Sequence, residues 1–279
     1  MILGLDGKPI LEINDNNYRG FVPDGDYRVT DSEGHEFYTG CLPVEDWDVS
    51  VMVTRPFESS GIVLYSEKEV KERLEDMWAA KASLMHLGYQ HDSLYQSRGT
   101  CWIHGTCVAG SLLYAKAGLP YRVPSPASVA YHCYTNFGVN GGYPSLGVEK
   151  FQQYGAASTE LWPENKHDRR YDTAATKADR VHNWLEEVVV LGSGEQGFWR
   201  GMSAICQGIP IGCSYRWWGH YVCGCWGRVQ NGEVKAGYRN TWGNSHGDKG
   251  FALLSGSRKY PQWCCAFLRM RQSPGNLKG

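Results

Sequence analysis

The chain has 279 residues and a formal net charge of −1, from 28 basic and 29 acidic side chains. Because neither sign forms a long run, the charge gives no electrostatic reason to expect binding to nucleic acid or to an anionic membrane. No apolar stretch approaches the roughly 20 residues that span a bilayer. The first residues, MILGLDGKPILEIND, hold no basic leader and no long apolar segment. We therefore expect no membrane span and no signal peptide, and a cytoplasmic or particle-associated protein, a virion included.

The chain contains 10 cysteines, spread along its whole length. Many cysteines in a small secreted protein indicate a disulfide framework. In a chain of this size, without an export signal at its start, reduced thiols are the better expectation.

Residues 1–65 are predicted to form short extended segments separated by turns, as the alternation at 27–30 indicates. The clearest predicted helix covers residues 66–88. Ser66 and Glu69 form a capping box at its start, and Gly88 is a stop signal at its end.

The rest of the chain divides into a helical part and a strand-rich part. Further helices are predicted at 101–118, 146–154, 174–188 and 198–206. After Gly208, short strand-like runs alternate with Asn-Gly and Gly-rich turns, which is typical of an antiparallel sheet. This order predicts an α+β fold with two packed halves, and a cleft between halves is a common place for a functional site.

Four short motifs carry candidate chemistry. The first is Gln96 followed by Gly99-Thr100-Cys101-Trp102, at the start of the helix predicted for 101–118. A helix N-terminus favours the thiolate over the thiol, whose ordinary pKa is about 8.5. The second motif, Asn140-Gly141-Gly142-Tyr143-Pro144, precedes another predicted helix. Glycines at such positions let a substrate strand approach the backbone.

The other two motifs lie in the strand-rich part. Gly219-His220 begins a strand-like run, and Asn240-Thr241-Trp242-Gly243 follows a second run. A cysteine at a helix start, followed far along the chain by a histidine and an asparagine, is the pattern of a thiol hydrolase.

Together, and in this order, the four motifs resemble those of the papain-like cysteine peptidases, and the Arg-Gly-Thr-Cys form is similar to bacterial and phage relatives. The resemblance covers more than half of the chain, from Gln96 to Leu254. It implies a papain-like two-lobed fold, with a helical lobe and an antiparallel β lobe. The peptidase domain would occupy residues 91–279, after an N-terminal extension at 1–90.

The resemblance also implies a role for each motif residue. Cys101 would be the nucleophile, His220 the general acid and base, and Asn240 the residue that orients the imidazole. Gln96 and the Cys101 N–H would donate to the oxyanion of the tetrahedral intermediate. The residues expected to bind a peptide or protein substrate are Gly99, Thr100, Gly141, Gly142, Tyr143, Tyr221 and Trp242. No metal and no cofactor are expected.

Three features depart from the family pattern. Gln96 lies one residue closer to Cys101 than is usual, so its oxyanion role is the least secure assignment. Tyr221 stands where a small residue is common, and a large ring there is expected to narrow the main specificity pocket. The extension at 1–90 is longer than the mature family start, so we expect an inhibitory pro-segment, a lid, or a module for docking onto a larger assembly.

Two other functions stay open on the sequence alone. One is a papain-fold structural or interaction protein of a virion or secretion particle, with little or no activity. The other is a hydrolase of peptidoglycan or isopeptide cross-links. A zinc site at His220, Cys223 and Cys225 is disfavoured because no second ligand pair has the usual spacing. His104, three residues after Cys101, is expected to pack in the core rather than to take part in catalysis.

Overall fold

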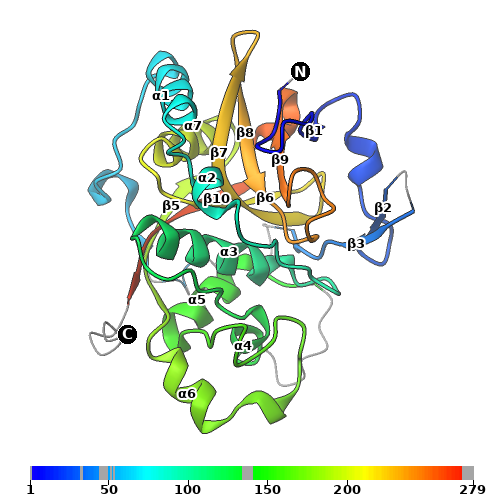
Figure 1. The fold of residues 1–279 in the computed structure, drawn as a ribbon, viewed down its shortest axis with the longest axis vertical. Coiled ribbons are helices and arrows are strands. Elements are labelled where there is room, and N and C mark those ends of the chain that lie inside the picture. The colour runs from blue at the N-terminus through cyan, green and yellow to red at the C-terminus, as the bar shows by residue number, and fades with distance from the viewer. Residues whose placement is uncertain are drawn as a thin grey trace.

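The computed structural model describes residues 2–31, 34–43, 50, 52, 54–133 and 141–271. Four helices form one lobe (Figure 1), with bounds α3 (Cys101–Lys116), α4 (Pro126–Ala130), α5 (Pro144–Tyr154) and α6 (Ala174–Arg180). The other lobe is built on a large sheet, which carries α1 (Glu67–Ala79), α2 (Leu84–Gly88) and α7 (Gly194–Ile205). Short 3₁₀ turns lie at Tyr18–Phe21, Phe57–Ser59, Arg169–Tyr171 and Gly256–Lys259.

The large sheet has eight strands in the order β1-β9-β8-β7-β6-β10-β5-β4. Its six central strands pair with one another in antiparallel fashion. Their bounds are β5 (Trp184–Gly192), β6 (Ile211–Tyr215), β7 (His220–Gln230), β8 (Glu233–Arg239), β9 (Phe251–Leu254) and β10 (Trp263–Arg271). The α+β architecture expected from the sequence is confirmed.

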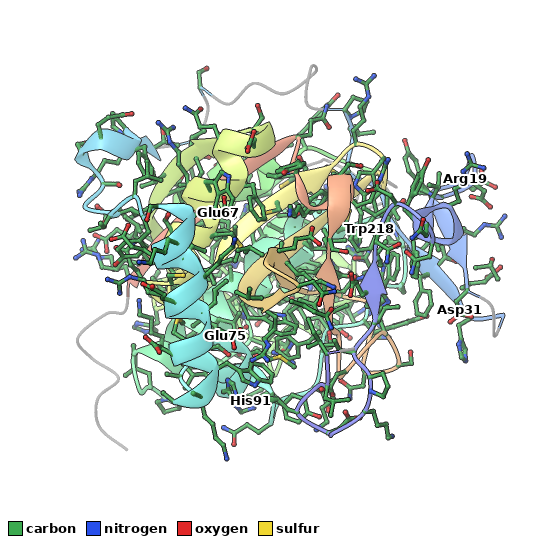
Figure 2. The ribbon with its side chains drawn as sticks, turned by 90° about the horizontal axis from the view of Figure 1, so that it is seen from above. Arg19, Asp31, Glu67, Glu75, His91 and Trp218 are labelled. Atoms are coloured by element: carbon green, nitrogen blue, oxygen red, sulfur yellow. The ribbon has the colours of Figure 1, made fainter. Side chains whose placement is uncertain are left out.

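Both outer strands of this sheet come from the first part of the chain. β1 (Glu12–Ile13) pairs in parallel with β9, and β4 (Thr54–Arg55) pairs in parallel with β5. Between them, β2 (Arg28–Thr30) and β3 (Glu36–Tyr38) form a separate two-stranded sheet. The N-terminal residues therefore run along the β lobe from one edge of its sheet to the other. In Figure 2, Arg19 and Asp31 lie at the outer rim of this segment, and Trp218 lies on its inner side, within the body of the protein.

Helix α3 lies where the helical lobe meets the large sheet. All of its residues from Cys101 to Tyr114 are buried, and it contacts α5 on one side and strands β7 and β10 on the other. A helix that is apolar or small on every face is suited to such a position, because no face is left to solvent. Its N-terminal end, where Cys101 lies, is thereby fixed at the junction of the lobes.

The prediction of a single helix over 66–88 is wrong, because the structure has two helices there, α1 and α2. The capping box is present, since Ser66 N donates to Glu69 Oε2 at 2.8 Å and Glu69 N donates to Ser66 Oγ at 3.3 Å. The helix then ends at Ala79: Lys81 has φ +54°, and Ala82 N donates to Met77 O at 2.9 Å. This is a left-handed helix stop made without glycine. α2 is a new helix capped by Ser83.

The helix predicted for 174–188 is wrong in its second half. α6 ends at Arg180, and residues from Trp184 belong to β5, which pairs with β10. Successive valines at 188–190 favour an extended strand because β-branched side chains fit a pleated surface. The helix predicted for 198–206 begins earlier, at Gly194. Among the described residues, no helix is long and apolar enough to cross a bilayer.

Candidate active site

Cys101 is the first residue of α3, and its side chain has no exposed surface. Burial raises the pKa of the thiol to about 12. Backbone N–H groups of Tyr221, Trp102, Cys101 itself and Cys41 act in the opposite direction, because they favour the thiolate. The sulfur thus lies in a set of amide donors suited to hold a negative charge, but it is shielded from water.

His220 and Asn240 are in direct contact across the junction of β7 and β8. His220 Nε2 lies 2.7 Å from Asn240 Oδ1. Asn240 Oδ1 also accepts a hydrogen bond from the backbone N–H of Thr241 at 2.8 Å. The hydrogen bond from Thr241 N identifies this atom as the amide oxygen, which can only accept. His220 must therefore be the donor of the second hydrogen bond, so Nε2 carries the proton.

This assignment leaves Nδ1 as the basic nitrogen of the neutral imidazole. His220 Nδ1 is buried, and no hydrogen-bond partner for it is found among the described residues. The backbone N–H of Tyr221, the next residue, faces the Cys101 sulfur. The Cys101 thiol therefore lies against the backbone of the residue that follows His220, while Asn240 holds the other ring nitrogen of His220.

Burial lowers the pKa of His220 to about 3, while the hydrogen bond to Asn240 acts in the other direction. Together with the raised pKa of Cys101, this means that both groups are neutral at ordinary pH. In this arrangement, burial of both groups opposes the formation of a thiolate–imidazolium pair. The cause is that both groups are removed from water.

Two indole rings enclose the imidazole of His220. The centroids of Trp218 and Trp242 each lie 4.8 Å from the centroid of the His220 ring, and Trp242 is only 1% exposed. They keep water from the His220–Asn240 hydrogen bond. The sequence analysis singled out Trp242 but missed Trp218, although its position just before Gly219-His220 was a usable signal.

Gln96 is 1% exposed, and its amide is fixed at both ends. Its oxygen accepts from Thr241 Oγ1, and its Nε2 donates to the carbonyl oxygen of Tyr38 at 2.7 Å. Trp242 Nε1 donates to the same Tyr38 oxygen at 2.6 Å. The amide of Gln96 therefore does donate to a peptide carbonyl, and that carbonyl comes from the N-terminal segment.

Residues 38–42, which we call the blocking segment, lie across the site in an extended conformation. Cys41 N donates to Gly219 O at 2.9 Å and Leu42 N donates to Gly142 O at 3.1 Å, while Gly142 N donates to Gly40 O at 2.9 Å. Cys41 and Gly142 form a parallel β-bridge. On its other side Gly142 packs against the Trp102 ring, since a Cβ at this position would lie 2.6 Å from that ring.

Gly99, Thr100 and Gly141 form the loop beside the blocking segment. Gly99 O accepts from Gly141 N at 2.8 Å, and Gly141 has φ +96°, which favours glycine. Thr100 is 2% exposed, and its hydroxyl donates to Arg98 O at 3.2 Å, within its own loop. Asn140, which begins the Gly-Gly motif, lies outside the described residues.

Within the described part of the chain, no hydrogen bond joins Tyr143 or Tyr221 to the blocking segment. Tyr143 is half-buried and precedes α5. Tyr221 has no exposed surface, and its ring fills the space between Gly105 of α3 and Gly212 of β6. Their roles in substrate binding stay predictions.

His104 is also fully buried, and its Nδ1 lies 2.9 Å from the carbonyl oxygen of Thr100, on its own helix. All 10 cysteines lie within the described residues and are free. Among the described residues, no group of three or more His, Cys, Asp or Glu side chains is arranged to hold a metal ion.

No protein-family model and no curated protein sequence matches the chain. Solved structures do match its fold. Xylellain, a cysteine protease from Xylella fastidiosa, has a TM-score of 0.55 and 14% identity over 84% of this chain and 96% of its own. This is the papain-like fold. A procathepsin B from Trypanosoma congolense matches with a TM-score of 0.54 and 15% identity, covering 82% of this chain and 85% of its own.

A third papain-like neighbour is Cwp84, a surface-layer-associated protein of Clostridium difficile, solved with its cysteine protease and lectin-like domains. Its TM-score is 0.58, with 12% identity over 86% of this chain and 57% of its own. At these identities the comparisons establish a shared papain-like fold, and the solved neighbours that share it are cysteine proteases.

Proposed function

We propose that the protein is a cysteine peptidase that cleaves peptide bonds through a Cys101 acyl-enzyme, and that the blocking segment keeps it latent. One observation carries this proposal. The backbone groups beside Cys101 hold an extended peptide, with hydrogen bonds to both the N–H and C=O of Gly142 and to the C=O of Gly219. A groove that binds main chain in this way suits a peptide substrate.

The chemistry follows from the arrangement of the side chains. With the blocking segment displaced, His220 Nδ1 takes the proton of Cys101, and the sulfur attacks the carbonyl carbon of the substrate. The oxyanion accepts hydrogen bonds from Gln96 Nε2 and from the Cys101 N–H. With the blocking segment in place, Gln96 Nε2 donates to Tyr38 O instead. His220 then passes its proton to the departing amine as the C–N bond breaks.

Water completes the cycle. His220 Nδ1 removes a proton from a water molecule, which attacks the thioester carbonyl. The second tetrahedral intermediate collapses, the carboxylic acid product leaves, and the proton returns to the Cys101 sulfur. Throughout, the hydrogen bond from His220 Nε2 to Asn240 Oδ1 keeps the ring in the required tautomer and orientation.

The test uses a variant that opens the site. Gly40→Ala is expected to displace the blocking segment, because a Cβ at this position would lie 2.5 Å from the Gly99 carbonyl oxygen. We expect Gly40→Ala to degrade an unfolded protein such as reduced casein faster than wild type does. The double variant Gly40→Ala/Cys101→Ala should be inactive. A folded Gly40→Ala protein that cleaves no peptide bond would contradict the proposal.

A second candidate is a structural or interaction protein that keeps the fold with little activity. The observation that favours it is the anchoring of the blocking segment, because β1 and β4 on either side of it both belong to the large sheet. Such a segment cannot leave without loss of sheet pairing unless only its middle moves. Absence of cleavage by both wild type and Gly40→Ala would favour this candidate.

A further inference from the structure

The blocking segment brings a second thiol to the catalytic one. Cys41 is 9% exposed, and Cys101 is fully buried. The backbone N–H of Cys41 faces the Cys101 sulfur, and Cys101, after burial, is the second cause that raises the pKa of Cys41. Both cysteines belong to the same buried cluster of side chains, and both are free.

The backbone on each side of these residues is closely held. Gly40 lies against Gly99, two residues before Cys101. The backbone N–H of Cys41 donates a hydrogen bond to the carbonyl oxygen of Gly219, the residue before His220, and Cys41 forms a β-bridge with Gly142. A disulfide requires Cα atoms within about 7 Å of each other. These contacts on three sides hold the Cys41 backbone beside the Cys101 sulfur. The Cys41 thiol, which donates to Leu42 O at 3.6 Å, must rotate away from that oxygen to form the bond.

We propose that Cys41 and Cys101 are a redox-modification site: a hydroperoxide converts the pair into a disulfide that locks the blocking segment over the nucleophile. The expected consequence of this disulfide, loss of peptidase activity, rests on the proposed function. The disulfide itself does not, because it can be detected directly.

The reaction proceeds from a state in which the segment has lifted, because burial keeps both thiols protonated in the closed state. With His220 beside it, the exposed Cys101 becomes a thiolate and attacks the peroxide oxygen. The O–O bond breaks, an alcohol or water leaves, and Cys101 becomes a sulfenic acid. Closure returns Cys41, whose sulfur attacks the sulfenic sulfur; the S–S bond forms and water leaves.

In this scheme two electrons pass from the two thiols to the peroxide, and a small thiol reductant restores both. The bond also protects the nucleophile, since a sulfenic acid without a partner is oxidised further and irreversibly. Cys213 and Cys264 also face each other, across β6 and β10, but both are buried in the middle of the large sheet.

The experiment treats full-length wild type, Cys41→Ser and the control Cys133→Ser with hydrogen peroxide. Free thiols are then alkylated, and unreduced peptides are mapped by mass spectrometry. Cys133 is a partly exposed cysteine in the turn after α4, so its variant tests general thiol loss. We expect a Cys41–Cys101 peptide in wild type and in Cys133→Ser, reversed by dithiothreitol. Cys41→Ser should instead accumulate Cys101 sulfinic acid, which dithiothreitol does not reverse; Cys41→Ala should give the same result if Cys41→Ser folds poorly.

The inference is overturned if wild type forms no Cys41–Cys101 peptide and loses Cys101 to sulfinic acid as fast as Cys41→Ser does. This outcome is distinct from failure of the proposed function. A protein that forms the disulfide reversibly but cleaves no peptide retains the redox site and loses only the peptidase assignment. A protein that cleaves peptides without forming the bond loses only the redox site.

Discussion

Gly40 of the blocking segment lies so close to Gly99 of the nucleophile loop that a Cβ on Gly40 would stand 2.5 Å from the Gly99 carbonyl oxygen. Gly40 also has φ +125°, a conformation that side chains with a Cβ rarely adopt. Two glycines in contact thus allow the segment to lie flat against the loop that carries Cys101. In the proposed function, latency depends on that close approach.

The contact predicts the effect of Gly40→Ala on the opening of the segment. Clash and backbone strain should cost the closed state about 1–3 kcal/mol, which corresponds to a rise of roughly 5- to 150-fold in the open population. Amide hydrogen exchange of Cys41, Leu42 and Gly142 should accelerate by the same factor. Gly34→Ala is the matched control, since Gly34 also has a positive φ (+85°) but no atom within 4 Å of its Cβ position. Equal exchange in the two variants would show that the contact does not hold the segment.

Asn240→Ala tests whether the tautomer of His220 matters. Without the Oδ1 acceptor, the proton is no longer directed to Nε2, and the ring is free to rotate. In the Gly40→Ala background we expect kcat/KM to fall by up to about 100-fold, with a changed acid limb in the pH profile because the hydrogen bond raises the pKa of His220. His220→Ala should remove activity altogether. A change in KM alone would assign Asn240 a role in substrate binding.

The buried histidines predict that the free energy of unfolding falls at acidic pH. Burial lowers the pKa values of His104, His220 and His246 to about 3, whereas an unfolded histidine titrates near 6.5. Their contribution to stability is therefore complete above about pH 6.5 and is lost as the pH falls towards 3. Each contributes a slope of about 1.4 kcal/mol per pH unit within that window.

Glu164 acts in the opposite direction, because burial raises its pKa to about 7. Its contribution is complete below the ordinary pKa of a glutamate and is lost as the pH rises through 7. Three histidines outweigh one glutamate, so the urea midpoint should be lower at pH 5 than at pH 7. His104→Gln should reduce this difference. An unchanged difference in that variant would mean that His104 is not buried in its neutral form.

The site was largely predictable from the sequence because its parts are carried by local motifs. Cys101 does begin a helix, and His220 does contact Asn240. Gly142 does pack against Trp102, and its backbone groups are hydrogen-bonded to the blocking segment. Each motif has its own local cause, such as a helix start or a glycine turn. The role of the motif residues in catalysis stays a proposal.

The blocking segment was not predictable in this way. Its contacts join residue 41 to residues 142 and 219, and nothing local to residues 38–42 indicates such partners. The helix expected at 66–88 failed at Lys81 because the turn uses a left-handed lysine instead of glycine. The strand from Trp184 was missed because its amphipathic start resembles a helix until it pairs with β10.

The most direct test of the account is the rate at which iodoacetamide alkylates Cys101 between pH 5 and 9, with mass spectrometry to identify the site. Wild type should react slowly throughout, because burial raises the pKa of Cys101 to about 12. Gly40→Ala should react much faster and already below pH 7, and adding His220→Ala should remove that low-pH reactivity. If Gly40→Ala and wild type react equally slowly, with a rise only at alkaline pH, then neither the blocking segment nor the activated thiol exists as proposed.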